Sequence, residues 1–267
     1  MPDRDAFREL ALASVRAASA VVVAADTAAR APETKAFGDY VTAVDRDAER
    51  AAIAVLRRGA PEIPVLAEES GGSIADRVWV IDPVDGTTNL VRGFPVVGVS
   101  VALVEEGRPV VGAVGAPHLR AEWSASEGQG AWDGTGRRLR VATFSGSGVA
   151  ATGFPFRRKE NLGRYLPAFE AALRRFEDLR RAGAATLDLA YAAAGTWDGF
   201  FELGLALWDI AAGSLLVREA GGIVTDWAGD PIAVFSSGDI VAGSPAWHEA
   251  MLEITSRSTR PEKPPDT

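Results

Sequence analysis

Residues 79–89 read Trp79-Val80-Ile81-Asp82-Pro83-Val84-Asp85-Gly86-Thr87-Thr88-Asn89 and carry the strongest structural signal in the chain. An apolar run from Val78 to Ile81 predicts a buried strand, and Asp82 stands at its end. Because proline lacks the backbone N–H of a strand ladder, Pro83 is expected to end the pairing. Gly86 then permits a tight turn. The segment therefore predicts a strand that delivers an acidic side chain to a rigid turn.

The same turn is expected to bring several oxygen atoms together. Asp85 and the Thr87 hydroxyl are directed towards the space beside Asp82, and the Val84 carbonyl can add another oxygen. Carboxylate, hydroxyl and carbonyl oxygens are the ligands that hard cations prefer. Asp-Pro and Asp-Gly pairs are also common in ordinary turns, so this turn by itself fits a purely structural role equally well.

Composition narrows the chemistry that the chain can support. Its 267 residues include no cysteine and two histidines, and the formal net charge is −8. The sequence therefore has no disulfide, thiolate zinc site, iron–sulfur cluster, cysteine nucleophile or three-histidine zinc site. The acidic balance disfavours sequence-independent binding to nucleic acid, which depends on a basic surface. The abundant carboxylates favour Mg²⁺ over Zn²⁺ if a metal is used.

Three further acidic clusters stand at the predicted ends of elements. Glu68 and Glu69 follow a short strand signal at 65–66, Asp209 opens a predicted helix, and Asp39 and Asp45 flank a short apolar stretch. Each cluster has an ordinary explanation. A Glu-Glu pair is commonly a solvated surface feature, and aspartate is a frequent helix N-cap.

Hydrophobic periodicity predicts an α/β chain. Helices are expected over about residues 3–29, 43–58, 162–175, 184–194, from near 209 to the Gly221-Gly222 pair, and 245–254. Strands are expected over residues 65–66, 78–81, 96–104, 110–116, 121–125, 139–142, 149–152, 179–180, 197–202, 223–226 and 240–242. The change from a β-rich to an alternating pattern predicts an N-terminal lobe (1–142), a C-terminal lobe (143–255) and a disordered tail (256–267), the two lobes forming one integrated unit.

Targeting signals are not expected. The chain has no apolar run of the ~20 residues that a membrane span requires. Acidic residues precede the first apolar stretch, whereas a signal peptide begins with a basic region. The sequence therefore predicts a cytoplasmic protein.

Two long segments give these clusters a common meaning. The segments WVIDPVDGTTNLVRGFP (79–95) and WDIAAGSLLVREAGG (208–222) resemble the two signatures of the inositol monophosphatase family of magnesium-dependent phosphatases. The similarity extends from about residue 5 to 255. The segment RRAGAATLDLAY (180–191) is most similar to the bacterial extragenic-suppressor type of this family.

The resemblance implies a site for two or three Mg²⁺ ions. The implied ligands of the first ion are Glu68, Asp82, the Val84 carbonyl and Thr87. The implied ligands of the second are Asp82, Asp85 and Asp209, and Glu68 also reaches a weaker third ion. The resemblance further implies catalytic roles for Glu68 and Thr87, which orient the attacking water, and for Asp45, which hydrogen-bonds to Thr87.

The resemblance also implies a set of substrate contacts. These residues are Asp85, Gly86, Thr87, Gly183, Ala185, Glu202 and Asp209. The backbone amides of Gly86 and Thr87 meet the phosphate, whereas Gly183, Ala185 and Glu202 contact the alcohol portion. Lys35 matches a lysine in a loop near the site.

The implied fold is the αβαβα sandwich of the sugar phosphatases, and the implied activity is Mg²⁺-dependent hydrolysis of myo-inositol monophosphate or a related small polyol or sugar phosphate. Alternative substrates are fructose 1,6-bisphosphate, histidinol phosphate and 3′-phosphoadenosine 5′-phosphate. A role as a protein partner in transcription complexes is an alternative of another class. The resemblance also implies a homodimer and inhibition by lithium.

The sequence departs from the family pattern at positions that carry no implied ligand. Ala67 replaces a glycine, and Leu90 and Arg92 stand where Phe and His are common. His118 and His248 are expected on loops and at the surface. The basic segment 157–159 is expected to be the solvated start of a helix.

Overall fold

The structure is a computed structural model that describes residues 4–36, 39–156 and 158–258. Its helices are α1 (Arg4–Ala24), α2 (Ala43–Gly59), α3 (Thr87–Arg92), α4 (Leu162–Arg175), α5 (Ala185–Ala193), α6 (Leu207–Glu219), α7 (Val234–Ser237) and α8 (Pro245–Ser258). Its strands are β1 (Glu33–Ala36), β2 (Asp39–Val41), β3 (Val65–Ala67), β4 (Arg77–Asp85), β5 (Gly98–Glu105), β6 (Arg108–Ala116), β7 (Ala121–Ser126), β8 (Gly130–Asp133), β9 (Val149–Thr152), β10 (Asp178–Arg180), β11 (Gly199–Glu202), β12 (Ile223–Thr225) and β13 (Ile240–Gly243).

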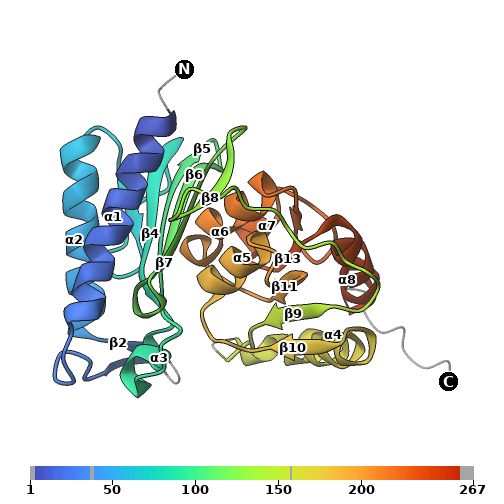
Figure 1. The fold of residues 1–267 in the computed structure, drawn as a ribbon. Helices are drawn as coiled ribbons and strands as arrows, with labels where there is room; N and C mark the ends of the chain where they lie inside the picture. Colours follow the sequence, from blue (N-terminus) through green and yellow to red (C-terminus); the bar gives the residue numbers. More distant parts are fainter. Residues whose placement is uncertain (1–3, 37–38, 157, 259–267) are drawn as a thin grey trace.

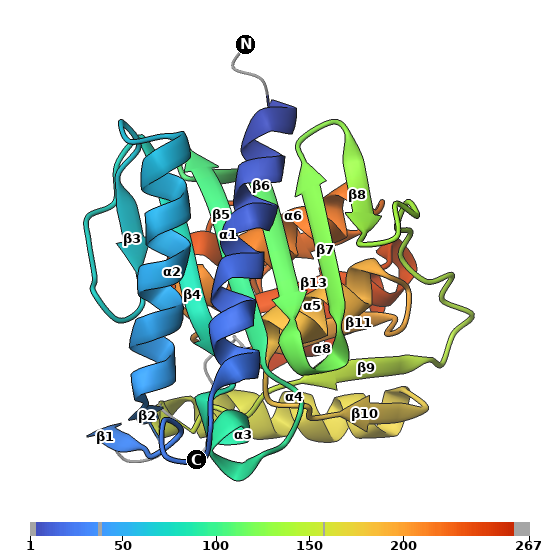
Figure 2. The ribbon, with the colours of Figure 1, turned by 60° about the vertical axis from the view of Figure 1, so that its left-hand side comes forward.

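Two large sheets organise the molecule into layers. The first has six strands in the order β3-β4-β5-β6-β7-β8, and the second has five in the order β10-β9-β11-β13-β12. Helices α1 and α2 cover the outer face of the six-stranded sheet, as Figures 1 and 2 show, and α5 and α6 fill the space between the sheets. Helices α4 and α8 cover the far side of the five-stranded sheet (Figure 1). The fold is therefore the expected αβαβα sandwich.

Most buried residues of the middle layer, α5 and α6, are small or apolar because both faces of the layer are covered. Helices that are apolar on all sides are typical of buried positions. Ala211, Ala212 and Leu216 of α6 are fully buried. At Gly112 of β6, an added Cβ would lie 3.0 Å from the Ala212 backbone, so the sheet and the helix approach as closely as glycine allows.

The two halves of the chain share this core. Helix α6 belongs to the second half of the sequence but packs against β4, β5, β6 and β7 of the first. One apolar cluster accordingly includes Val80 and Val114 together with Leu189 and Leu216. The proposed lobe boundary near residue 143 stays a prediction.

Four predicted boundaries are wrong for identifiable reasons. Helix α1 ends at Ala24 rather than near residue 29, because the Asp26 carboxylate accepts from the Ala29 backbone N–H at 2.8 Å and stabilises a turn. Strand β4 continues past Pro83 to Asp85 through an irregularity in its pairing with β5. No strand forms over 139–142, where single backbone bonds from Leu139 and Val141 reach Ala131 and Ala220.

The fourth error concerns the C-terminus. Helix α8 continues to Ser258, so residues 256–258 are helical rather than part of a disordered tail. Residues 259–267 lie outside the described part of the chain. Strand β8 was not predicted, because its four residues lie between glycines that are typical of turns.

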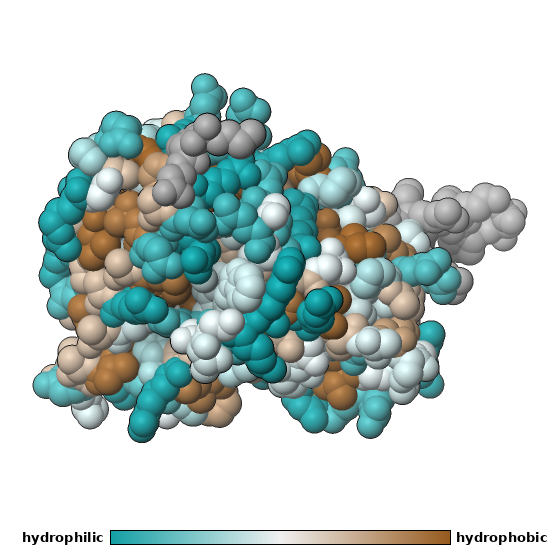
Figure 3. All heavy atoms as spheres, turned by 45° about the horizontal axis from the view of Figure 1, so that its top comes forward, coloured by the Kyte–Doolittle hydropathy of each residue, from teal (hydrophilic) through white to brown (hydrophobic). Residues whose placement is uncertain are grey.

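The surface has no dominant apolar face in the view of Figure 3, where apolar patches are separated by hydrophilic side chains. Large exposed apolar residues include Leu162, Leu166 and Leu173 on α4. No helix in the described part of the chain is long and apolar enough to cross a membrane.

Candidate active site

The turn after β4 forms the centre of the site. Gly86 is the residue before α3, and its φ of 89° lies in the left-handed region that favours glycine. A Cβ at this position would lie 3.0 Å from the Val96 carbonyl oxygen and 3.1 Å from that of Gly183. Glycine is therefore required here both for the turn and for its contact with the second half of the chain.

Asp45 orients the Thr87 hydroxyl from behind. Thr42 is the N-cap of α2, and Asp45 Oδ2 accepts from the Thr42 backbone N–H at 2.9 Å and from its hydroxyl at 2.5 Å. Asp45 Oδ1 lies 2.9 Å from Thr87 Oγ1, which is also 3.2 Å from the Val84 carbonyl oxygen. A hydroxyl has one proton to donate, so the Thr87 proton is directed to one of these buried acceptors. The implied Thr87–Asp45 contact is present, whereas its role in catalysis stays a prediction.

Four carboxylates act on one another at the same place. Asp82 is 1% exposed and its Oδ1 accepts from the Val84 backbone N–H at 3.0 Å. Burial raises the pKa of the Asp82 carboxyl well above its usual range, and the negative charges of Glu68, Asp85 and Asp209 raise it further. Such mutual repulsion favours the binding of a cation, and the oxygen-only donor set fits a hard divalent ion.

Hydrogen bonds from backbone groups orient two of these acids. Asp85 Oδ2 accepts from both the backbone N–H and the hydroxyl of Thr186, each at 2.7 Å. Asp209 Oδ2 accepts from the Ala206 N–H at 2.7 Å at the start of α6. As they stand, no group of three or more acidic, histidine or cysteine side chains within residues 4–36, 39–156 and 158–258 is arranged to hold a metal ion. The implied ligand roles therefore stay predictions.

Glu49 is a supporting residue that sequence reasoning missed. It is 3% exposed, and its two carboxylate oxygens accept from the backbone N–H groups of Glu69 at 2.8 Å and Ser70 at 2.9 Å. These bonds hold the turn that follows β3 and carries Glu68. Glu49 lies one helical turn after Asp45 on α2, a spacing that places both on one face of the helix.

A cavity of about 410 Å³ opens beside the turn. It is lined by every implied substrate contact, namely Asp85, Gly86, Thr87, Gly183, Ala185, Glu202 and Asp209. The cavity therefore joins the β4 turn to β11 and to the starts of α5 and α6. The Lys35 side chain lies outside the described part of the chain.

Comparison with known proteins identifies the family. Residues 3–260 match the family described as the inositol monophosphatase family. The chain belongs to the inositol monophosphatase family. This family is part of a phosphatase superfamily, and its members are generally metal-dependent.

Individual relatives of this inositol monophosphatase family member carry two kinds of name. A protein of Pseudomonas aeruginosa called Nus factor SuhB is 45% identical over 237 residues, which are 85% of each chain. The structure of the extragenic suppressor protein suhB from Bartonella henselae matches with a TM-score of 0.88 at 34% identity, over 94% of this chain and 99% of that one. The inositol monophosphatase from Anabaena (Nostoc) sp. matches with a TM-score of 0.82 at 31% identity, over 95% of this chain and 96% of that one.

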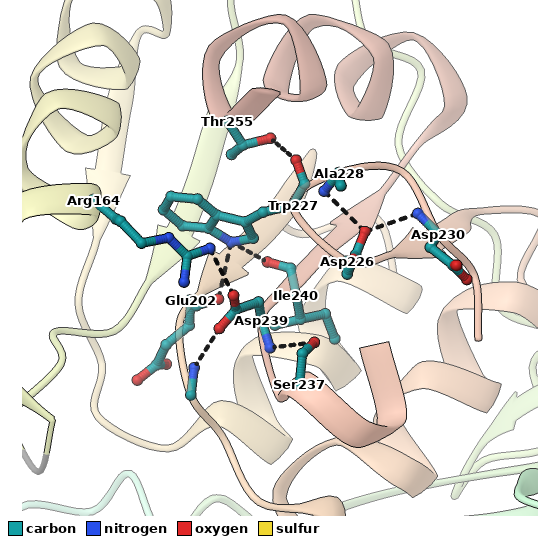
Figure 4. A network of polar contacts seen from close by, with 11 residues as sticks. Arg164, Glu202, Asp226, Trp227, Ala228, Asp230, Ser237, Asp239, Ile240 and Thr255 are labelled. Atoms are coloured by element: carbon teal, nitrogen blue, oxygen red, sulfur yellow. Dashed lines mark hydrogen bonds and ion pairs between the residues drawn. The ribbon is translucent and has the colours of Figure 1, made fainter. Parts of the chain in front are cut away.

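In this family member the strand that carries Glu202 is fixed by a polar network behind the cavity (Figure 4). The Trp227 indole N–H donates to the Glu202 carbonyl at 3.0 Å, and Arg164 pairs with Asp239 at 2.7 Å. Asp239 also accepts from the Gly204 N–H at 3.1 Å. The Glu202 carboxylate points away from this network in Figure 4, and Glu202 lines the cavity. The polar network thus holds the Glu202 backbone, while Glu202 itself is part of the cavity wall.

Several residues that line the cavity were not assigned from the sequence. Arg158 lines the cavity, so it is not merely part of a solvated helix start, whereas Arg157 lies outside the described residues. Arg181 stacks over Phe154 and Phe156 at 5.4 and 5.5 Å from the ring centres. Asp188 on α5 also lines the cavity.

One sequence expectation about histidine is wrong. His248 is 4% exposed rather than at the surface, and its Nε2 lies 2.8 Å from Thr225 Oγ1. Burial lowers its pKa to about 4. The residue sits at the start of α8, away from the cavity walls, and therefore has a packing role.

Proposed function

We propose that this chain is a Mg²⁺-dependent phosphatase that hydrolyses myo-inositol monophosphate or a related small polyol phosphate. The observation that carries the proposal is the position of Asp85 and Asp209. Both act electrostatically on the buried Asp82, and both line the cavity of about 410 Å³. A substrate phosphate in that cavity would therefore lie directly against the carboxylate cluster.

The residues that would hold Mg²⁺ are Glu68, Asp82, Asp85, Thr87, Asp209 and the Val84 carbonyl. When bound, the metal supplies activation of the attacking water and neutralises charge on the phosphoryl oxygens. Unaided hydrolysis of phosphate monoesters is among the slowest known reactions, so this contribution must be large.

The protein's own groups position the reactants. The hydrogen bond between Thr87 and Asp45 fixes the hydroxyl beside the cavity, and Glu68 and Thr87 orient the attacking water. The backbone amides of Gly86 and Thr87 meet the phosphate at the same turn. The leaving alkoxide takes its proton from solvent, and no covalent intermediate with the protein is required.

The alcohol end of the cavity supports a polyol substrate. Glu202 lines that end, and a carboxylate accepts hydrogen bonds from neighbouring hydroxyl groups. Fructose 1,6-bisphosphate, histidinol phosphate and 3′-phosphoadenosine 5′-phosphate are the alternative substrates. Like myo-inositol monophosphate, these three compounds contain a phosphate ester that could bind beside the carboxylate cluster.

The test is a phosphatase assay with these four substrates at equal concentration. We expect Mg²⁺-dependent phosphate release from myo-inositol monophosphate above the other three, loss of activity with EDTA, and inhibition by Li⁺. Activity that is independent of Mg²⁺, or absent for every substrate, would contradict the proposal. A higher kcat/KM for one of the other three would keep the phosphatase and change the substrate.

A protein-binding role is the second candidate function, because relatives at 45% identity are called Nus factors. Affinity capture of transcription proteins by the wild type and by Asp82→Asn separates the two roles. Equal capture by both proteins, with activity lost only in the variant, would support a binding role independent of catalysis. No capture by either protein would count against it.

A homodimer is proposed on the same family grounds. Leu162, Leu166 and Leu173 are exposed along α4 and offer apolar surface that a second copy could cover. Light scattering at micromolar concentration tests this directly. A monomeric mass would contradict it.

A further inference from the structure

One oxygen of the Asp188 carboxyl group is buried without a hydrogen-bond partner in the described part of the chain. Asp188 is 1% exposed, and its Oδ1 has no hydrogen-bond partner within residues 4–36, 39–156 and 158–258. Nearly all buried polar atoms in proteins are hydrogen-bonded, because an unsatisfied one costs free energy. Because Asp188 also lines the cavity, a ligand bound there can supply the missing partner.

The surroundings of Asp188 point to the cavity as the source of that partner. Asp188 lies one turn into α5, three residues after Ala185, and lines the same cavity as Glu202 and Arg181. The Arg181 guanidinium stacks on Phe154 and Phe156 rather than pairing with Asp188 in the part of the chain that the structure describes. Arg181 therefore acts on Asp188 electrostatically without a salt bridge between them in the described residues.

The Glu202 side chain packs tightly against the backbone at Gly153 in the same cavity. A Cβ at Gly153 would lie 1.9 Å from Glu202 Oε2, so the carboxylate lies directly against the Gly153 backbone. The two carboxyl groups come from different elements, β11 and α5, and both line the alcohol end.

We propose that Asp188 is a specificity-determining residue that hydrogen-bonds to a hydroxyl of the substrate's alcohol portion, next to the hydroxyl that Glu202 binds. The inference rests on the proposed function and names its substrate class as phosphate monoesters with two neighbouring hydroxyl groups. A site built to hydrogen-bond a hydroxyl rejects analogues that lack it, because its own buried groups are then left unpaired.

The chemistry of the pair suits a diol. A carboxyl group accepts a hydrogen bond when ionised and can also donate one when protonated, so Asp188 can serve a hydroxyl in either state. The amide of asparagine can also both accept and donate a hydrogen bond, and it has nearly the same shape as the carboxyl group. Leucine has a similar size and neither capacity. Asp188→Asn and Asp188→Leu therefore separate hydrogen bonding from packing.

The experiment measures kcat and KM with Mg²⁺ for myo-inositol 1-phosphate and for p-nitrophenyl phosphate, which has no alcohol hydroxyl. We expect Asp188→Leu to lower kcat/KM for the inositol ester by about 10- to 100-fold, chiefly through KM, and to change p-nitrophenyl phosphate by less than about twofold. Asp188→Asn is expected to stay within about threefold of the wild type on both substrates.

Ser214→Ala is the matched control. Ser214 lies on α6 in the same middle layer, is fully buried and also lacks a hydrogen-bond partner for its hydroxyl within the described residues, but it does not line the cavity. This variant is expected to leave the ratio of the two kcat/KM values unchanged. Melting temperatures of all variants confirm that each is folded.

The outcomes distinguish this inference from the proposed function. Equal losses on both substrates in Asp188→Leu, or no loss on either, would overturn the specificity role while the phosphatase activity stands. A wild type that hydrolyses neither ester would overturn the proposed function and the inference with it.

Discussion

The two ends of the cavity are built differently. At the turn after β4, the acids are oriented by hydrogen bonds from the protein: Asp45 from Thr42, Asp85 from Thr186, and Asp209 from Ala206. At the alcohol end, Asp188 has an oxygen with no partner in the described chain, and Arg181 rests on aromatic rings. The acids proposed for the reaction are thus oriented by the protein, whereas one oxygen of Asp188, proposed for selectivity, has no such support among the described residues.

This difference predicts that substitutions at the β4 turn lower activity on every substrate. Asp82→Asn should show the largest effect, a fall in kcat of about 1,000-fold, or ~4 kcal/mol in activation free energy, because a central proposed ligand is lost. Steady-state kinetics at saturating Mg²⁺ measures it on both inositol monophosphate and p-nitrophenyl phosphate.

Asp226→Asn is the control for this substitution. Asp226 accepts hydrogen bonds from Ala228 and Asp230 in a loop outside the cavity walls, so its replacement should leave kcat nearly unchanged. Near-normal activity in folded Asp82→Asn would contradict the proposed role of Asp82 as a Mg²⁺ ligand.

Thr87→Ala should lower kcat by about 100-fold on both substrates, because the hydroxyl that Asp45 orients is removed. Asp45→Asn should cost about 10- to 100-fold, since it changes the orientation of Thr87 without touching substrate. Thr87→Ser retains the hydroxyl and is the rescue variant. If Thr87→Ala and Thr87→Ser had the same kcat, the hydroxyl would have no part in the reaction.

Gly153→Ala examines the alcohol end by displacing a carboxylate rather than removing one. The added methyl group would collide with Glu202, so KM for inositol monophosphate should rise by about 10-fold while p-nitrophenyl phosphate is little affected. Gly163→Ala on α4 is the matched control, because a Cβ there meets nothing within 4 Å. A uniform loss on both substrates would show that Gly153 serves the whole site.

The smallest expected effect concerns stability without metal. The folded-state pKa of Asp82 is raised above its unfolded value, so its contribution to stability is fully present below the unfolded pKa and is lost as pH rises through the folded pKa. In EDTA at pH 7, the melting temperature of Asp82→Asn should therefore be a few degrees above that of the wild type. The substitution removes one negative charge from a group of carboxylates that repel one another. This difference should shrink as pH falls towards 4.

Saturating Mg²⁺ is expected to reverse the order of the two melting temperatures at pH 7, because only the wild type retains the complete site. Differential scanning calorimetry with and without the ion measures both parts. A pH-independent difference in EDTA would mean that Asp82 is not under electrostatic repulsion.

The sequence was most informative where short motifs carry both backbone and chemical constraints. The family resemblance predicted the layered fold, and the implied substrate contacts all line the cavity, although their roles stay predictions. Glu49 and Asp188 escaped notice because their importance depends on contacts between distant segments. Glu49 accepts from a backbone amide 20 residues away along the chain, and one oxygen of Asp188 has no hydrogen-bond partner among the described residues.

The errors in secondary structure have a similar origin. The apolar run at 139–142 has the composition of a strand, but its backbone groups meet single partners in β8 and after α6 instead of a neighbouring ladder. Strand β8 has the opposite character, since its pairing with β7 stabilises a segment with turn-like composition. Tertiary contacts decide both cases, and local propensity does not contain them.

The thickness of the middle layer has a consequence for how this protein can change. Asp209 is the third residue of helix α6, and small residues such as Gly213 let this helix pack closely against α5. At Gly213, a single added carbon would already lie 2.5 Å from Leu189. A larger residue at Gly213 would therefore have to displace either Leu189 or the helix that carries Asp209. Substitutions in this layer can therefore affect the proposed site through packing alone.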